Sequence, residues 1–291
     1  MNVIVQLVRR NMLMFLRDKM SVFFSFLSVI IIILLYALFL GDINTQGLAA
    51  DYGNIEGVEF MVNTWIMAGI LTVSTVTVPL GVLGNLIADR ENGTLSDFYT
   101  SPITRNQLAL SYLISSWIIG FMLVFANFLI GQAYIVVNGG SLLPLNDALL
   151  VLLCIILSII VFTSFFFLIA LFMKTQKSFG LLSTLVGTFI GFLGGIYVPI
   201  GAITGFAGDV MKALPSMHSV ALIRSIYMKE SMSAVFSGAP SSVQNDYMDF
   251  FGVSVEVFGF QLNNLHLLLL LVGFALLMYT ISILRLRRYK L

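Results

Sequence analysis

Six apolar stretches, each long enough to cross a lipid bilayer, constrain the fold of this chain more than any other feature. They cover residues 22–40, 61–87, 108–137, 148–173, 179–200 and 262–284. A helix needs about 20 apolar residues to cross the hydrocarbon core, where every backbone group must be satisfied within the protein. Only 10% of the residues are charged, against roughly a quarter in soluble proteins. The chain is therefore predicted to be an all-α polytopic membrane protein with six transmembrane helices.

These spans use most of the 291 residues, so residues 1–291 are predicted to form one transmembrane domain without a second, soluble one. Cys154 is the only cysteine, and His218 and His266 lack the spacing of metal ligands, so neither a disulfide within the chain nor a metal site is expected. The net charge of +1 gives no reason to expect a nucleic acid partner. The first 20 residues carry charges throughout, unlike a cleavable signal peptide.

Residues 1–20 are predicted to form an amphipathic helix that lies in the membrane interface. Its apolar side chains fall on one arc of a helical wheel: Ile4, Val5, Val8, Met12, Phe15 and Leu16. The opposite arc carries Asn2, Gln6, Arg10 and Arg17. Because Leu7, Leu13 and Met14 blur this separation, the alternative is a basic flank that only sets orientation.

Lysine and arginine residues are distributed unequally between the two sides of the predicted spans. Twelve of the fifteen lie on one side: Arg9, Arg10, Arg17, Lys19, Arg90, Arg105, Lys174, Lys177, Arg285, Arg287, Arg288 and Lys290. The other side has Lys212, Arg224 and Lys229 beside an acidic loop with Asp42, Asp51, Glu56 and Glu59. The positive-inside rule therefore predicts a multi-pass protein of the cell membrane with both termini and residues 88–107 in the cytoplasm.

Residues 88–107, between the second and third spans, are patterned as a short helix of their own. Thr94 and Asp97 have the spacing of a capping box, which predicts a helix start at Thr94. Leu95, Phe98 and Tyr99 would form a small apolar edge on that helix. Such a rigid helix suits docking into a groove of a soluble partner, and the alternative is an ordinary polar turn.

Two further signals end this short helix and begin the next one. Pro102 disfavours a helical conformation at Ser101. Thr104 and Gln107 repeat the capping-box spacing, which predicts that the third span begins there.

The stretch R-E-N-G-T-L followed by S-P-I-T-R resembles the cytoplasmic loop of type-2 ABC transporter permeases. That family has a charged pair, Gly-Thr-Leu, and then a small residue, a proline and a basic residue; the matching residues are Arg90, Glu91, Gly93, Thr94, Leu95, Ser101, Pro102 and Arg105. The resemblance implies that residues 88–107 hold the coupling helix, which contacts the ATPase subunit. The implied coupling residues are Arg90, Glu91, Gly93, Thr94, Leu95, Phe98, Ser101 and Pro102. Ser111 is a departure, since many members have a lysine near this position.

The resemblance extends over nearly the whole chain and implies the permease subunit of an ABC exporter. The implied assembly holds two permease copies, as a homodimer or a paralogous heterodimer, and two P-loop ATPase subunits. The chain contains no GxxxxGK[ST] phosphate loop. It is therefore expected not to be an enzyme and to carry no cofactor, with ATP and Mg on the partner ATPase. The absence of Asp, Glu, Lys and Arg from the six predicted spans argues against an ion-coupled carrier.

The fifth apolar stretch is rich in glycine and is predicted to be broken. Gly187 and Gly191 have the GxxxG spacing that lets two helices approach closely. The strings G-G-I-Y-V-P-I and L-P-S-M-H resemble the part of the family with a broken helix and re-entrant helices. Gating or dimer contacts are assigned on this basis to Gly187, Gly191, Gly194, Gly195, Pro199 and Pro215, and residues 201–261 to a re-entrant and extracellular segment. The alternative is an ordinary span followed by a plain loop.

Polar side chains within the second and third spans allow two interpretations. Thr72, Thr75, Asn127 and Gln132 either form hydrogen bonds within and between helices or line a transport pathway. The 25 Phe and 14 Met residues favour an amphiphilic substrate, such as a drug, peptide, toxin or lipid-like molecule, unless these side chains face membrane lipid.

Two other functional classes remain open from the sequence. One is a membrane-embedded enzyme or assembly factor with a site in the Pro215–Arg224 segment, which includes His218. The other is a simple channel, which would need neither a docking helix nor a nucleotide-binding partner.

Overall fold

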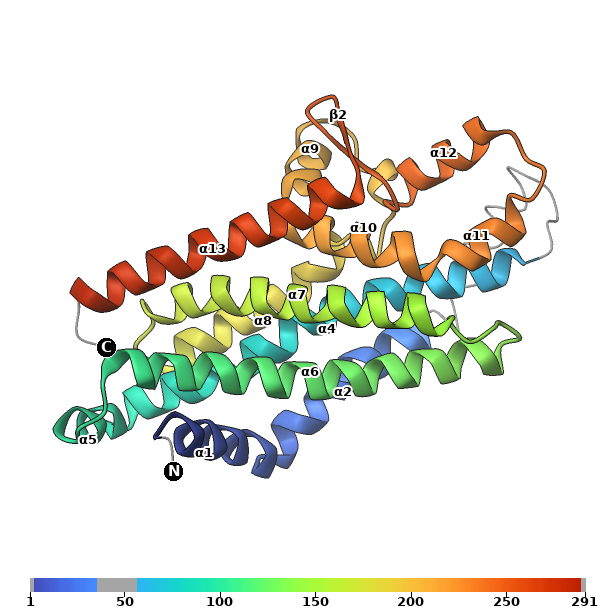
Figure 1. The fold of residues 1–291 in the computed structure, drawn as a ribbon. Helices are drawn as coiled ribbons and strands as arrows, with labels where there is room; N and C mark the ends of the chain where they lie inside the picture. The colour runs from blue at the N-terminus through green and yellow to red at the C-terminus, as the bar shows by residue number, and fades with distance from the viewer. Residues whose placement is uncertain (1–2, 36–56, 289–291) are drawn as a thin grey trace.

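The computed structural model describes residues 3–35 and 57–288 (Figure 1). The helices are α1 Val3–Arg17, α2 Lys19–Leu35, α4 Val58–Glu91, α5 Thr94–Thr100, α6 Arg105–Val137, α7 Leu145–Ala170, α8 Gln176–Leu193, the 3-10 turn η2 Ile200–Ala202, α9 Gly205–Ala213, α10 Pro215–Tyr227, α11 Lys229–Val235, α12 Ser241–Phe250 and α13 Asn264–Arg288. Strands β1 Val255–Val257 and β2 Phe260–Leu262 complete the fold. Asn2, the end of the first predicted span, Asp42, Asp51, Glu56 and Lys290 lie outside the described residues.

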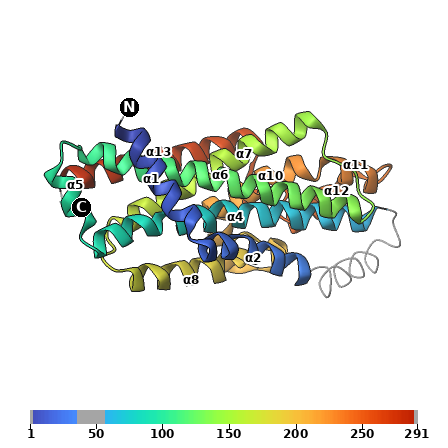
Figure 2. The same ribbon diagram turned by 90° about the horizontal axis from the view of Figure 1, so that it is seen from below.

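Four helices of the described part are long and apolar enough to span a membrane, namely α4, α6, α7 and α13. Within an apolar 18-residue segment of each helix, 89% of α4 is buried, against 22% of α13. α4 is therefore the central helix, and α13 is peripheral. α2 and α8 have 17 and 18 described residues and lie along the same side of α4 (Figure 2). The helices agree with an all-α polytopic membrane protein, and the count of six spans stays a prediction.

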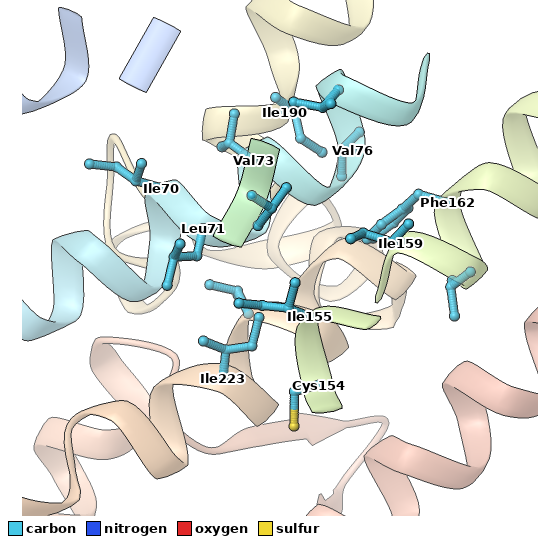
Figure 3. Packing of buried hydrophobic residues seen from close by; sticks show 14 of the residues in the cluster. Ile70, Leu71, Val73, Val76, Cys154, Ile155, Ile159, Phe162, Ile190 and Ile223 are labelled. Carbon is cyan, nitrogen blue, oxygen red and sulfur yellow. The ribbon is translucent and has the colours of Figure 1, made fainter. Parts of the chain in front are cut away.

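The core is a continuous set of apolar side chains between α4, α6, α7 and α10. Figure 3 shows Ile70 and Leu71 of α4 near Ile155 of α7 and Ile223 of α10. Each of these side chains is no more than 1% exposed. Small residues let the helices come close, and a Cβ at Gly120 of α6 would lie 3.2 Å from Pro79 of α4. The contacts with α4 therefore set the positions of the surrounding helices.

A separate N-terminal helix is present, but it is shorter than the predicted helix over residues 1–20. α1 ends at Arg17 and α2 begins at Lys19. The Asp18 carboxylate accepts hydrogen bonds from the N–H groups of Met20 and Ser21 and from the Ser21 hydroxyl. These bonds lower the pKa of Asp18 and satisfy the first N–H groups of α2. Asp18 thus acts as a helix cap and separates the two helices.

The fifth apolar stretch is broken, but the predicted helix over residues 179–200 is too long. α8 ends at Leu193 because Gly195 adopts φ +60°, and the N–H groups of Ile196 and Tyr197 turn back to the Gly191 carbonyl. The chain then forms η2, α9 and α10 in succession.

Residues 201–261, assigned from the sequence to a re-entrant and extracellular segment, include a helix that is buried in the bundle. α10 packs against α4, α7 and α13, and Arg224 is completely buried. Further along, β1 and β2 form an antiparallel hairpin in which Val255 pairs with Leu262. Its turn residues Phe258 and Gly259 both have positive φ, as a two-residue type I′ hairpin turn requires.

We predict opposite effects for alanine at the two GxxxG glycines. A Cβ at Gly191 would lie 2.2 Å from the Tyr197 ring, whereas a Cβ at Gly187 meets nothing within 4 Å. Gly191→Ala should lower the free energy of unfolding by about 1–3 kcal/mol through overpacking. Gly187→Ala should raise it by up to about 1 kcal/mol through helix propensity. Thermal unfolding of the monomeric fraction in detergent measures both, and equal effects would contradict the packing described here.

Candidate functional site

Three consecutive charged residues at the C-terminal end of α4 each bind a different part of the fold. Asp89 contacts α1 and α6, Arg90 contacts the end of α7, and Glu91 contacts the start of α8. The short helix α5 follows immediately, at the same end of the bundle (Figure 1). We call Asp89, Arg90 and Glu91 the charged end of α4.

Asp89 is only 3% exposed, although it is a carboxylate near a helix C-terminus, where the backbone dipole disfavours negative charge. Both of its oxygens accept hydrogen bonds from the Arg10 guanidinium at 2.6 Å, and the Tyr112 hydroxyl donates a third. The hydrogen bond to Asp89 raises the pKa of Arg10, so the arginine stays charged. This pair explains how a buried carboxylate is tolerated. Sequence reasoning placed Arg10 on the outward polar arc and did not identify Asp89.

The neighbouring Asn11 strengthens the attachment of α1. Its side-chain amide donates to the Ser111 hydroxyl at 3.3 Å, and its backbone carbonyl accepts from the Asn85 side-chain amide at 3.1 Å. Asn11 is 1% exposed. Polar contacts therefore hold α1 against α4 and α6 in addition to apolar packing by Leu7, Val8 and Phe15.

Arg90 and Glu91 together hold both ends of the turn between α7 and α8. The Arg90 guanidinium donates to the carbonyls of Ala170 and Met173, at the C-terminus of α7. The Glu91 carboxylate accepts from the N–H of Gln176, the first residue of α8, at 2.7 Å. A cation at a helix C-terminus and an anion at a helix N-terminus are both favourable. The charged pair of the loop pattern thus binds the chain's own second turn.

α5 begins at Thr94 as predicted, but the predicted capping box of Thr94 and Asp97 is wrong. Gly93 occupies the cap position with φ +78°, and no side chain bonds to the first turn. Because the left-handed Gly93 redirects the chain, Thr94 is already helical. The second predicted box is confirmed, since the Gln107 N–H bonds to Thr104 Oγ1 and the Thr104 N–H bonds to Gln107 Oε1.

Leu95 and Phe98 of α5 face the protein itself, so the prediction that this apolar edge is free for a partner is wrong for Leu95. Leu95 is 3% exposed, and Phe98 is half-buried with the Arg10 guanidinium 5.3 Å from its ring centre. The Ser101 hydroxyl bonds to the Phe98 carbonyl and ends the helix before Pro102. Among residues 91–100 whose exposure the structure describes, the exposed ones are Glu91, Asn92, Gly93, Ser96, Asp97 and Thr100, and none of these has a large apolar side chain.

At the other end of α8, a buried arginine that sequence reasoning placed outside joins the assigned gating residues to the outer helices. The Arg224 guanidinium donates to the carbonyls of Gly195 and Phe251, each at 2.9 Å. It also lies 4.6 Å over the Trp65 ring, whose indole N–H donates to the Phe251 carbonyl. The sequence signal for this burial is that Arg224 is the single charged residue within the string S-V-A-L-I-R-S-I-Y.

The other assigned gating residues flank the same region. Gly194 follows the end of α8, Pro199 precedes η2, and Pro215 is the first residue of α10. Proline suits that first position, where a helix needs no N–H donor.

The four assigned pathway residues are buried in the bundle and support the interpretation as structural hydrogen bonds. Thr72 and Thr75 bond to carbonyls of their own helix and are at most 1% exposed. The Asn127 amide donates to the Ser74 hydroxyl at 3.1 Å, and the Gln132 amide donates to the Tyr227 hydroxyl at 2.6 Å. These bonds link α6 to α4 and α10.

A hollow of about 500 Å³ lies instead between α2, α4 and α8. Its lining includes Ser25, Thr77, Ser183, Gly187 and Tyr197, beside apolar residues such as Phe24. Of the residues assigned from the sequence, only Gly187 belongs to it. Within the residues that the structure describes, no group of three or more His, Cys, Asp or Glu side chains could hold a metal ion.

Four helices long and apolar enough to cross a bilayer, packed around the central α4, define a helical membrane protein. The sequence model of the ABC-2 type transporter family matches residues 2–228, and the chain belongs to this family. It is thus the transmembrane subunit of an ABC transporter, a multi-pass membrane protein that works with an ATP-binding subunit. A search of curated proteins found no match.

We predict that Arg10→Ala destabilises the chain by about 2 kcal/mol, below the range for a fully buried pair because Arg10 is partly exposed. The loss leaves the Asp89 carboxylate buried without its cation. Arg10→Ala combined with Asp89→Asn should recover most of the stability, because the buried charge is then removed too. Arg9→Ala, on the exposed neighbour, is the matched control. Thermal unfolding in detergent measures all three, and a double variant no better than Arg10→Ala would contradict this account.

Proposed function

We propose that this chain is the permease of an ATP-driven exporter that moves an amphiphilic substrate out of the cell. The observation that carries the proposal is the charged end of α4, which fixes the exposed helix α5 to α1, α7 and α8. The proposed assembly has two permease copies, as a homodimer or a paralogous heterodimer, and two P-loop ATPase subunits that carry ATP and Mg.

Movement of α5 would reach the bundle through the charged end of α4. Only Asn92 and Gly93 separate α5 from α4, and Leu95 fixes α5 in the core. Through Arg90 and Glu91 the turn between α7 and α8 follows α4, and through Asp89 so does α1. Closure of the ATPase subunits would therefore tilt these helices together rather than bend α5 alone.

The residues assigned to coupling divide into two groups under this proposal. Arg90, Glu91, Gly93, Leu95, Phe98, Ser101 and Pro102 build and hold the helix. The partner contacts its exposed face, which carries Ser96, Asp97 and Thr100. Thr94 lies between these groups, because it is half-buried at the first turn.

The gating role falls on the region where α8 ends. Gly194 and Gly195 end the helix, and Arg224 ties the Gly195 carbonyl to the outer helices through Phe251. If α8 tilts at its Gln176 end, which Glu91 holds, the hydrogen bond between Arg224 and the Gly195 carbonyl would be strained. The hollow between α2, α4 and α8, with both hydroxyl and apolar walls, would receive the amphiphile, and its open side would face the second permease copy at Gly187.

We predict that reversing the charge on the exposed face of α5 uncouples the ATPase. Asp97→Arg should reduce the amount of ATPase that co-purifies, and the ATPase activity coupled to transport, by roughly tenfold, because charge complementarity is lost at a contact surface. Asp209→Arg is the control, since Asp209 is an exposed acid on α9, which lies apart from α5 (Figure 1). Normal ATPase recovery with Asp97→Arg, or purification of the wild-type chain without any ATPase, would sink the proposal.

With α2 and α8 counted as spans, the six spans would place α5 in the cytoplasm and residues 229–261 at the outer surface. We predict that a membrane-impermeant maleimide labels Ser237→Cys in intact cells and labels Ser96→Cys only after the membrane is opened. Both positions are exposed. The native Cys154 is buried and should add little background. Labelling of Ser96→Cys in intact cells would reverse the proposed orientation.

A further inference from the structure

A second cavity, of about 280 Å³, lies where the broken fifth region turns back into the bundle. Its floor is formed by Val76 of α4, Phe162 and Phe166 of α7, and Ile190 of α8, each no more than 6% exposed. Figure 3 shows Val76, Phe162 and Ile190 in the same part of the core. This cavity shares no lining residue with the hollow between α2, α4 and α8.

Among the residues that the structure describes, the walls of this cavity offer no free hydrogen-bonding group to a polar ligand. Ser216 is the one hydroxyl among the lining residues, and it already donates to the Leu193 carbonyl at 3.2 Å. An apolar cavity of this kind stays free of water, and one of about 150 Å³ binds a molecule the size of benzene. A cavity of about 280 Å³ therefore suits a longer, unbranched apolar group without a head group at its tip.

The open side of the cavity faces the apolar exterior of the bundle. Val186 of α8 and Phe274 of α13 line it and are half-buried. The surface beside them is also apolar, with Leu185 57% exposed on α8 and Leu277 54% exposed on α13. In a membrane this surface meets lipid chains, so hydrocarbon is the material that can reach the opening.

We propose that this cavity binds one hydrocarbon chain of a membrane lipid, which enters end first between α8 and α13. The bound chain would touch Leu193, the last residue of α8, and Pro215, the first residue of α10. It would thereby hold the spacing between the two helices on either side of the break. The binding of lipid does not depend on the exporter proposal. An effect of the bound lipid on gating does rest on that proposal.

Photo-crosslinking of the full chain in phosphatidylcholine nanodiscs tests this proposal. A small fraction of the phospholipid carries a diazirine at the end of one acyl chain, and peptide mapping locates the adducts after illumination. Adducts should be enriched on the cavity residues Phe162, Phe166 and Phe274 relative to Leu129 of α6, which is 51% exposed on the exterior. Equal labelling of cavity and exterior would overturn the proposal.

A matched pair of tryptophan variants on α8 tests the entry route. Val186→Trp fills the opening and should reduce the cavity adducts by roughly fivefold, because a bulky side chain takes the volume of the ligand. Leu185→Trp, one residue away on the exposed face, should leave them unchanged. Cavity labelling that survives Val186→Trp would overturn the entry between α8 and α13. Size-exclusion chromatography checks the folding of both variants, and should Val186→Trp misfold, the wild-type adduct map decides alone.

Discussion

A carboxylate buried at the end of a helix is tolerated only if cations and hydrogen-bond donors surround it, and the arrangement of this fold around α5 depends on that requirement. Asp89 is such a group, and Arg10 and Tyr112 satisfy it. Because Arg10 belongs to α1 and Tyr112 to α6, the electrostatic need of one side chain fixes three helices together. An apolar contact of similar area would allow sliding, whereas a bidentate ion pair fixes both distance and orientation.

A buried charge also needs hydrogen-bond partners at the far end of α8, where these partners are backbone carbonyls. Arg224 is buried, and the acceptors described for its guanidinium are carbonyls at the ends of helices, with the Trp65 ring over its face. Arg90 likewise meets the last carbonyls of α7. Helix C-termini offer carbonyls without intrahelical partners, so they suit a planar cation with several donors. Two arginines thus join helix ends at opposite ends of α8.

Local signals predicted the parts of the fold that local chemistry determines. The apolar lengths, the second capping box at Thr104 and the break at Gly194 and Gly195 all follow from neighbouring residues. The pairing of Arg10 with Asp89 joins residues 79 positions apart and leaves no trace in either neighbourhood. The burial of Arg224 was missed because a short helix with one arginine looks like an external segment until α4, α7 and α13 enclose it. Leu95 was assigned outward because a helix edge does not reveal which side it packs against.

The position of Leu95 changes what the loop pattern means. The charged pair holds the turn between α7 and α8, Gly93 supplies the left-handed conformation, and Leu95 fills the core. Each of these pattern residues therefore attaches α5 to its own subunit. The exposed side chains of Ser96, Asp97 and Thr100 lie between the two halves of the pattern. If α5 is the coupling helix, as proposed above, the pattern residues would hold it rigidly, and the choice of ATPase would depend on residues that the pattern leaves unspecified.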